Sequence, residues 1–241
     1  MLDRKSSQPL YAQFEEIVRH KIGSGEWPID SAIPSENELS AIYGISRMTV
    51  RSVLTNIVAE GLLYRVQGKG TFVSEPKILS RPLSQMGIRA QLEHMGYETS
   101  TELLGFQEIH APGWTAEKLN IYPASPIFVV TRLRYIKDVP FSIHRSYIPK
   151  AICPDLDKQD LERMQLCDIQ EQIYHQEIVR RVETLESVIS TSEESELLKI
   201  RKNSPLLLFE NLVYTKDDRP IECSKVLFRA EKIKLRMEYI K

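Results

Sequence analysis

Hydrophobic positions follow a helical period through the first part of the chain. After Pro9, which suits the first turn of a helix because its missing N–H costs nothing there, apolar residues recur at helical spacing as far as Ile22. Gly23 and Gly25 then end the run. The pattern predicts a first amphipathic helix that packs its apolar side on a core.

Two further helices are predicted after the loop "EWPIDSAIP". In "PSENELSAIYG", Ser35 and Glu38 have the spacing of a capping box, and Gly44 stands where a helix ends. Ser46 can cap a third helix that runs to about Glu60, with apolar residues on one side and polar residues on the other.

The segment "LLYRVQGKGTFVS" changes from a helical to an alternating period. Alternation predicts two short strands, and Gly68-Lys69-Gly70 predicts the tight turn between them. Three helices followed directly by such a hairpin are the elements of a winged helix-turn-helix domain.

The pattern changes again at "EPKILSRP", a polar connector bracketed by two prolines. We therefore expect a first domain over residues 1–75, a linker over 76–82 and a second domain over 83–241. The second domain mixes strands and helices in an order that favours an α+β fold with an antiparallel sheet. Strands are predicted at 101–111, 125–136, 139–149, 180–190, 204–215 and 219–230, and helices around 88–95, 114–120, 159–176 and 192–200.

Two stretches of the second domain resemble each other. "SPIFVVTRLRYIKDVPFSIHRSYIP" and "SPLLLFENLVYTKDDRPIECSKVLF" share a strand, a Lys-Asp turn, a proline and a returning strand. The hairpin turns fall at Lys137-Asp138 and Asp217-Asp218. This duplication predicts a pseudo-symmetric sheet with a site between its halves.

The formal net charge of the 241-residue chain is −1, so contact with a nucleic acid has to rest on a local patch. Residues 1–75 hold eight Lys and Arg against nine Asp and Glu, whereas residues 45–74 hold four against one. The chain lacks an apolar run long enough for a membrane span and its first residues lack a signal peptide, so we expect a cytoplasmic protein. Its three cysteines form no CxxC pair, which favours free thiols, and neither a metal nor a cofactor is expected.

The third helix and the hairpin carry side chains suited to DNA. Most contacts of a helix in the major groove come from its first two turns, and Arg can bridge guanine O6 and N7. The hairpin turn offers backbone N–H groups and one cation to phosphates or to the minor groove. Singly, each arginine is compatible with a solvated helix and "GKG" with a plain turn, but their combination indicates DNA recognition. The residues expected to contact DNA are Ser46, Arg47, Thr49 and Arg51 of the helix and Gln67, Gly68, Lys69 and Gly70 of the turn.

Residues 8–74 resemble the N-terminal domain of the GntR family of bacterial transcription regulators, through "PLYAQ", "PSENELSAIYGISRMTVRSVL" and "EGLLYRVQGKGTFV". The resemblance implies that the helix arginines, Thr49 and the wing carry DNA recognition. It departs at Asn37, where the family usually has an Arg that helps to contact DNA. Because one winged helix reads few base pairs, we expect a homodimer on a palindromic site in double-stranded DNA.

Residues 80–241 resemble the effector-binding UTRA domain of the HutC subfamily, whose fold is like that of chorismate lyase. The resemblance rests on "RAQLEHMGYETSTELLGF", "VTRLRY", "PFSIHRSYIP" and "SPLLLFENLVYTKDDRPIECSKVLFRA". Members of the subfamily commonly sense small phosphorylated sugars or anions derived from amino acids. The resemblance therefore implies a small anionic effector.

An anion site calls for arginine side chains and for backbone N–H groups at a helix start. Arg132 and Arg134 share one face of a strand, and "QMGIRAQL" opens a helix. Two positions depart from the sugar-phosphate pattern of the subfamily: His144 replaces Glu and Asp168 replaces Ser. The ligand therefore differs from an amino-sugar phosphate, or the site is rearranged. The expected effector residues are Gly87, Ile88, Arg89, Arg132, Arg134, His144, Asp168, Glu222 as an acceptor for ligand hydroxyls, and Phe228 as an apolar wall.

Each of these assignments has a structural alternative. The two arginines can belong to a solvated strand face, His144 can be a structural histidine, and Glu222 can pair with Lys225 or Arg145.

The sequence thus predicts a ligand-responsive repressor of a metabolic or transport operon, with an activator or a regulator of amino-acid-derived metabolite use as the alternative. A lyase-like enzyme is a remote alternative, because the sequence has no GxSxG, HExxH or P-loop motif. The small patch and the near-neutral charge argue against a nonspecific nucleoid protein.

Overall fold

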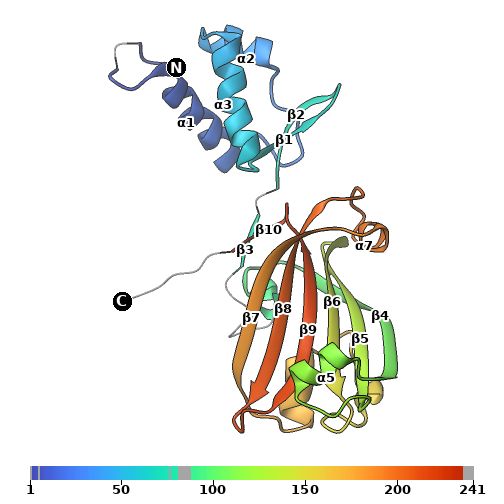
Figure 1. Ribbon diagram of the computed structural model, residues 1–241. Helices are drawn as coiled ribbons and strands as arrows, with labels where there is room; N and C mark the ends of the chain where they lie inside the picture. Colours follow the sequence, from blue (N-terminus) through green and yellow to red (C-terminus); the bar gives the residue numbers. More distant parts are fainter. Residues whose placement is uncertain (1, 5, 76, 81–87, 236–241) are drawn as a thin grey trace. The chain divides into compact units, whose positions relative to one another are not determined.

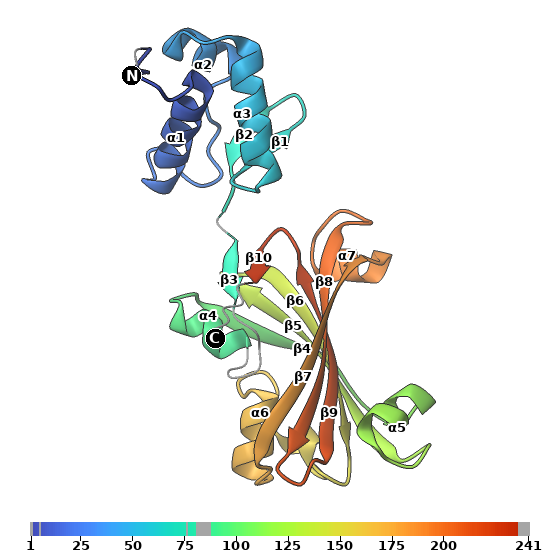
Figure 2. The same ribbon diagram turned by 60° about the vertical axis from the view of Figure 1, so that its left-hand side comes forward.

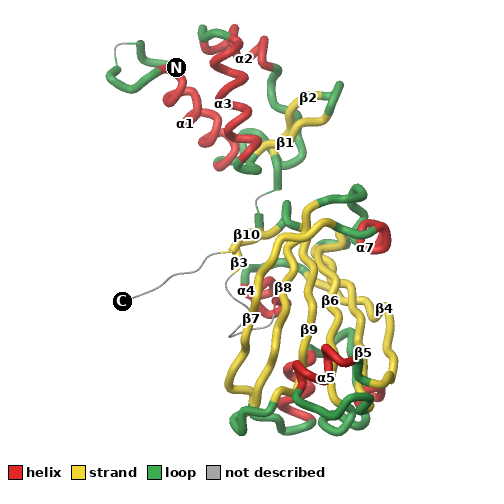
Figure 3. The backbone as a smooth tube through the Cα atoms, in the orientation of Figure 1, coloured by secondary structure: helices red, strands yellow, loops and turns green. Residues whose placement is uncertain are grey.

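The computed structural model of the chain describes residues 2–4, 6–75, 77–80 and 88–235 (Figure 1). It divides into two compact units, Met1–Lys77 and Ile78–Lys241. Figure 3 shows that helices dominate the first unit and long strands the second. None of the described helices is long and apolar enough to cross a membrane.

Unit 1 consists of three helices and a hairpin, which confirms the winged helix-turn-helix prediction. α1 (Leu10–Gly23), α2 (Glu36–Tyr43) and α3 (Arg47–Ala59) are followed by β1 (Leu63–Val66) and β2 (Gly70–Val73). Their apolar faces share one hydrophobic core, which fixes the three helices and the hairpin relative to one another. The largest fully buried side chains of this core are Phe14, Leu39, Leu54, Ile57 and Leu63.

The predicted helix caps of unit 1 are present. Ser35 Oγ accepts a hydrogen bond from the Glu38 N–H at 3.3 Å, and the Glu38 carboxylate accepts one from the Ser35 N–H at 2.8 Å. Gly44 ends α2 with φ +63°, a left-handed conformation that glycine adopts at little cost. Ser46 Oγ then accepts from the Thr49 N–H at 3.1 Å and starts α3. These caps define the turn between the two helices.

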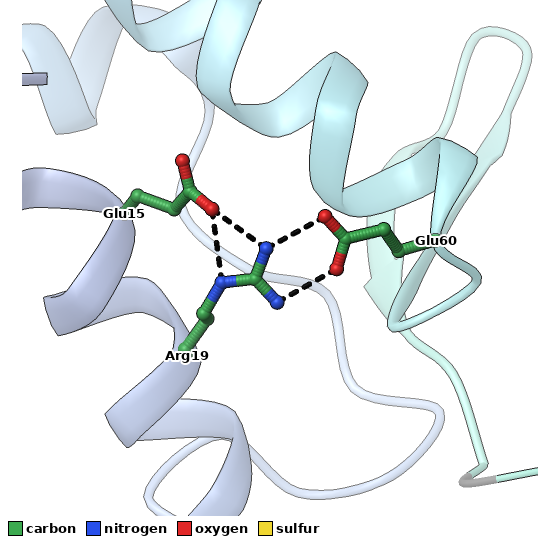
Figure 4. Close-up of polar contacts among 3 residues, drawn as sticks. All are labelled: Glu15, Arg19 and Glu60. Atoms are coloured by element: carbon green, nitrogen blue, oxygen red, sulfur yellow. Dashed lines mark hydrogen bonds and ion pairs between the residues drawn. The ribbon is translucent and has the colours of Figure 1, made fainter. Parts of the chain in front are cut away.

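Arg19 links α1 to the C-terminal end of α3 (Figure 4). Its two terminal nitrogens donate to the two Glu60 oxygens, each at 2.7 Å, and its Nε donates to Glu15 at 3.0 Å. The hydrogen bonds to Glu60 and then to Glu15 raise the pKa of Arg19. This contact holds the C-terminal end of α3 against α1, whereas Arg47 and Arg51 lie near the N-terminal end of α3.

Unit 2 is built on one antiparallel six-stranded sheet with strand order β4-β5-β6-β9-β8-β7. All six long strands predicted from the alternating pattern are present, and the α+β prediction is confirmed. The strands are β4 (Thr99–His110), β5 (Pro126–Ile136), β6 (Val139–Pro149), β7 (Ile178–Ile189), β8 (Pro205–Thr215) and β9 (Pro220–Arg229).

The two similar stretches form the hairpins β5–β6 and β8–β9, and these meet where β6 pairs with β9 at the centre of the sheet. Each hairpin follows a strand and a short helix: β4 and α5 (Gly113–Leu119) in one half, β7 and α7 (Ser192–Leu197) in the other. The sheet thus has the pseudo-symmetry that the duplicated pattern predicted.

The helices of unit 2 cover the two faces of the sheet differently (Figure 2). α4 (Ile88–His94) and α6 (Leu166–Asp168) lie on one face, which we call the inner face. There Ile88 packs with Val226, and Leu166 packs with Val213. α5 and α7 cover the ends of the opposite, outer face. The inner face between α4 and α6 therefore offers a place for a site at the centre of the sheet.

Two parts of unit 2 differ from the sequence prediction. Where one helix was expected over 159–176, an irregular stretch leads into α6 and a π-helical turn (Ile169–Ile173), and a 3-10 turn (Leu156–Lys158) precedes it. The irregular stretch contacts the sheet: the carboxylate of Glu162 accepts from the Leu103 N–H at 2.9 Å.

The second difference lies within the expected linker. Ile78–Ser80 form the strand β3, which pairs in parallel with β10 (Ile233–Leu235). Three residues are too few to display a strand period, and the two partners are far apart in the sequence.

Candidate functional site

The exposed surface of unit 1 has an open groove between the start of α2, the start of α3 and the wing formed by β1 and β2. We call it the reading groove; its volume is about 620 Å³. Six of the residues predicted to contact DNA line it: Arg47, Arg51, Gln67, Gly68, Lys69 and Gly70. The groove thus brings together side chains from α3 and from the wing, the two elements on whose combination the DNA-binding prediction depended.

Ser46 and Thr49, the other two predicted DNA contacts, do not line the reading groove. The Ser46 hydroxyl is engaged at the helix start, where it lies 2.8 Å from the Thr49 hydroxyl and accepts from the Thr49 N–H. Ser46 is exposed and Thr49 is half-buried. Because their hydroxyls are engaged with each other at the start of α3, the structure shows them as capping residues of that helix.

The tip of the wing is shaped by its glycines. Gly68 has φ +75° and Gly70 has φ +124°, conformations that other residues rarely adopt. The Lys69 N–H donates to the Val66 carbonyl at 3.0 Å, which closes the turn and leaves the Lys69 side chain exposed. Below the tip, the rings of Tyr64 and Phe72 stack with centroids 5.5 Å apart and stiffen the hairpin.

A carboxylate, Glu36, lies among the arginines of the reading groove. It is 3.2 Å from Arg51 Nε and 3.4 Å from Arg65 Nη2, and Arg65 also donates to the Thr55 hydroxyl at 3.1 Å. Arg65 contributed to the predicted charge patch but was not predicted as a contact residue. Its exposed position on the predicted strand just before the wing turn could have indicated that Arg65 also lines the DNA-binding surface. Asn37, the departure from the family pattern, lines the same groove.

Unit 2 has a cavity of about 80 Å³ on the inner face, across the pairing of β6 with β9; we call it the arginine cavity. It contains five of the predicted effector residues and further side chains from both halves of the sheet. The predicted residues are Ile88, Arg132, Arg134, His144 and Glu222; the others are Ser146, Gln165, Leu166, Cys167, Arg181, Asn211, Val213, Ser224 and Val226.

The two arginines that name the cavity are buried, with 4% of Arg132 and 5% of Arg134 exposed. Arg132 Nη1 donates to the carbonyls of Leu161 and Met164 at 3.3 and 3.4 Å, and neither Nε has a hydrogen-bond partner. Within the described residues, no carboxylate forms an ion pair with either guanidinium. Burial lowers the pKa of both, and burial together with Arg132 lowers the pKa of Arg134 to about 9. Two buried cations with free donors are what an anion requires.

The second half of the sheet supplies hydrogen-bond acceptors. Glu222 is buried and accepts from Gln170 Nε2 at 3.0 Å. Asn211 Oδ1, which lines the cavity, and Gln170 Oε1 of the π-helical turn are buried without a hydrogen-bond partner among the described residues. The arginine cavity therefore has donors on the β5 side and acceptors on the β8–β9 side, and a ligand with an anionic group and hydroxyl or amino groups can satisfy both.

Three predicted effector residues lie elsewhere in the structure. Arg89 donates to Glu93 at 2.7 Å and to the Arg163 carbonyl at 2.8 Å, so its guanidinium joins α4 to the segment before α6. Asp168 lies at the end of α6, outside the cavity lining. Phe228 is fully buried in the core beside α4 and does not line the cavity; its ring lies 6.0 Å from that of His144 between centroids. Gly87 lies outside the described residues.

Asn211 could have been predicted from the repeat. It occupies in "SPLLLFEN" the position that Arg132 occupies in "SPIFVVTR", so the two are equivalent in the two halves of the sheet. Arg181, Gln165 and Cys167 carried no such signal, because they lie outside the repeat, in β7, just before α6 and in α6.

Comparisons with known proteins assign the two units. Residues 10–73 match the model of "Bacterial regulatory proteins, gntR family", and residues 94–234 match that of the UTRA domain. The chain is 32% identical over 231 residues to the HTH-type transcriptional repressor NagR of Bacillus subtilis, covering 96% of this chain and 95% of the relative. The chain belongs to the GntR family.

Other GntR-family proteins agree with this assignment. A histidine utilization repressor of Pseudomonas putida is 29% identical over 97% of this chain and 93% of its own length, as the resemblance to the HutC subfamily predicted. The crystal structure of PhnF from Mycobacterium smegmatis superposes with a TM-score of 0.68 at 21% identity, covering 94% of this chain and 99% of that one, which shows the shared fold.

The GntR assignment makes the chain a DNA-binding transcription regulator with a separate effector domain. The reading groove lies within the segment that matches the GntR model, and all but one of the residues of the arginine cavity lie within the UTRA match. The exception is Ile88, six residues before the UTRA match begins.

Proposed function

We propose that this protein is a cytoplasmic repressor of a metabolic or transport operon, and that a small anionic effector bound in the arginine cavity releases or repositions it on DNA. Two similar proteins, NagR and the histidine utilization repressor, are named as repressors, which supports repression over activation. The observation that carries the proposal is the pair Arg132 and Arg134, buried without a counter-ion among the described residues and aimed into one cavity.

The regulator acts as a homodimer on a palindromic operator. One α3 helix and one wing contact only a few base pairs, and joining two copies raises affinity through effective concentration. An effector then needs only a different affinity for two arrangements of the dimer in order to change DNA binding. Light scattering tests the dimer: at micromolar concentration we expect twice the chain mass, and a mass of one chain would contradict it.

The chemistry of the cavity supports a phosphorylated sugar as the effector class. Arg132 and Arg134 suit the phosphate, and Glu222 with Asn211 suits the hydroxyls of the sugar. An amino-acid-derived anion is the second candidate, because a similar protein is a histidine utilization repressor.

A sensing role is favoured over catalysis. Cys167, the thiol that lines the cavity, has its pKa raised by burial and by Asp168, so the nucleophilic thiolate form is disfavoured. A sensor returns its effector unchanged, so incubation with the effector should give no product.

The test combines DNA and effector in one binding experiment. The palindromic sequences upstream of the gene are labelled, and fluorescence anisotropy measures their binding in the presence of sugar phosphates or small amino-acid-derived anions. We expect at least one anion to weaken operator binding by the wild-type chain and to have no effect on Arg132→Gln. Arg145→Gln, which removes an exposed arginine from the outer face of β6, is the matched control and should respond like wild type. An Arg132→Gln chain that still responds would contradict the proposed site.

A further inference from the structure

His144 stands in the arginine cavity directly opposite Arg132, its partner in the β5–β6 register. Only 7% of the residue is exposed, and its Nε2 lies 2.8 Å from the Ser142 hydroxyl. The ring is also held edge-on against Phe228. The charged and titratable groups that line the same cavity are Arg132 and Arg134 from β5, Glu222 from β9, Arg181 from β7 and Cys167 from α6; α4 contributes the apolar Ile88.

Charge balance keeps the imidazole neutral while the cavity is empty of ligand. Two buried arginines face one buried carboxylate, Glu222, which leaves the buried part of the site with one excess positive charge. Burial and the charges of Arg134 and Arg132 hold the pKa of His144 well below its ordinary value. Arg181 is partly exposed, so its charge acts on the ring more weakly than the charges of the two buried arginines.

The charge of a bound anion decides whether this neutral state persists. A singly charged anion cancels the excess positive charge, and a proton on the imidazole would restore it. A doubly charged anion leaves one excess negative charge, which a proton on the imidazole neutralises. Because Coulomb interactions are strong in a buried cavity, this difference of one charge has a large effect on the proton affinity of the ring.

We propose that His144 is a specificity-determining residue that selects doubly charged anions by taking up one proton from solvent when such an anion binds beside Arg132 and Arg134. The inference rests on the proposed anion-binding function of the cavity. Ser142 is compatible with both states, since its hydroxyl donates to an unprotonated Nε2 and accepts from a protonated one. The proton joins the ring nitrogen that carries none in the neutral form, and the imidazolium then has a second N–H to offer.

Sulfate and methyl sulfate form a matched pair of probes, since both carry the same head group but differ by one charge and neither titrates near neutral pH. Proton uptake by unbuffered wild-type protein is followed in a pH-stat at about pH 6.5, with ionic strength held constant. We expect close to one proton per chain bound with sulfate, and none with methyl sulfate. Because the ring pKa is raised in the complex, sulfate affinity should fall about tenfold per pH unit between the ring pKa of the free protein and that of the complex, and should level off at higher pH. The two arginines stay charged over this range.

His144→Gln tests whether the proton resides on this residue. The variant should bind sulfate with an affinity independent of pH, while His110→Gln, which removes an exposed histidine of β4, should keep the wild-type pH dependence. The wild-type pH-stat result stands even where the variant folds poorly. Sulfate binding without proton uptake, or uptake that persists in His144→Gln, overturns the inference while leaving the anion site in place. Failure of both anions to bind at any concentration overturns the site and the inference together.

Discussion

Arg51 is the side chain of α3 whose position is most direct for reading a base. It is exposed, lies in the second turn of the helix and lines the reading groove beside the wing. Arg47 precedes it by one helical turn, so both guanidinium groups can enter the same stretch of a major groove.

Replacing Arg51 with Ala should weaken operator binding by about 1–3 kcal/mol, the value of a bidentate contact to guanine, and should relax discrimination at one base position. Anisotropy titrations of the operator and of single-base variants measure both effects. Arg163→Ala, which removes an exposed arginine from unit 2, is the control for net charge. Unchanged discrimination in Arg51→Ala would mean that the side chain contacts phosphate or nothing at all.

We expect Glu36 to make DNA binding by Arg51 and Arg65 more selective for the operator. Its carboxylate partly neutralises Arg51 and Arg65 and fixes their direction through contacts of 3.2 and 3.4 Å. Such exposed pairs contribute little stability, so the importance of Glu36 lies in orienting the guanidinium groups and in opposing nonspecific phosphate contacts.

Glu36→Gln should therefore bind random DNA more tightly while its preference for the operator falls. The slope of log K against log salt for random DNA should steepen by about 0.9 for each phosphate that a released arginine engages. Glu16→Gln, on the exposed part of α1 and outside the groove lining, should leave the slope unchanged. A steeper slope in both variants would point to net charge alone.

At the residue scale, the alternation of side chains along the strands predicted more of the residues that line the arginine cavity than residue type did. Arg132, Arg134 and His144 meet because every second residue of a strand points to one face and because register places Arg132 opposite His144. Arg89 was expected there for its backbone N–H at a helix start and Asp168 for its place in the subfamily pattern, but the path of the chain around α4 and α6 puts both outside the cavity lining. Such a path depends on tertiary contacts that no local pattern encodes.

At the scale of elements, the position of α3 depends on both of its ends. The Ser46 cap fixes the start, and the bidentate contact of Arg19 with Glu60 fixes the end against α1 (Figure 4). The arginine side chain is 34% exposed and that of Glu60 47%, so solvent screens the pair and its contribution is smaller than its geometry suggests.

Arg19→Met keeps the length of the side chain and removes these contacts, and it should destabilise unit 1 by up to about 1 kcal/mol. Urea unfolding followed by Trp27 fluorescence reports on unit 1 once Trp114 of unit 2 is replaced by Phe. Arg180→Met is the matched control: it breaks the exposed ion pair of Arg180, on β7, with Asp218. It should not move the unfolding transition reported by Trp27. An unchanged transition in Arg19→Met would show that core packing alone holds α3 against α1.

Helices and strands that were long enough to show several hydrophobic periods were predictable, and short or interrupted ones were not. The six long strands and the three helices of unit 1 each extend over enough residues to display a period. β3 and β10 have three residues each and pair across the sequence, and the region before α6 exchanges helical hydrogen bonds for contacts such as that of Arg132 with the Leu161 carbonyl. The same departure from helix therefore helps to position one of the cavity arginines.

For the whole molecule, the proposed regulation is a coupling free energy between the reading groove and the arginine cavity, and such coupling is reciprocal. If an effector weakens operator binding by some factor, the operator must weaken effector binding by the same factor. This holds whatever path connects the two units, because it follows from the closed cycle of four binding equilibria. A factor that reaches a finite limit at saturating effector indicates coupling between two sites. In simple competition of an anion with DNA phosphates for the groove, the apparent Kd of the operator would instead keep rising with anion concentration.

The expected result is that saturating operator DNA raises the Kd of the effector by the factor by which saturating effector raises the Kd of the operator, typically 5- to 150-fold for coupled sites. Calorimetry of the effector with and without operator, set beside anisotropy of the operator with and without effector, measures both factors. Arg132→Gln should abolish both factors while keeping operator affinity. If the anion competed at the reading groove instead, Arg132→Gln would retain the full inhibition and Lys69→Gln would reduce it. The two variants together therefore locate the site at which the anion acts.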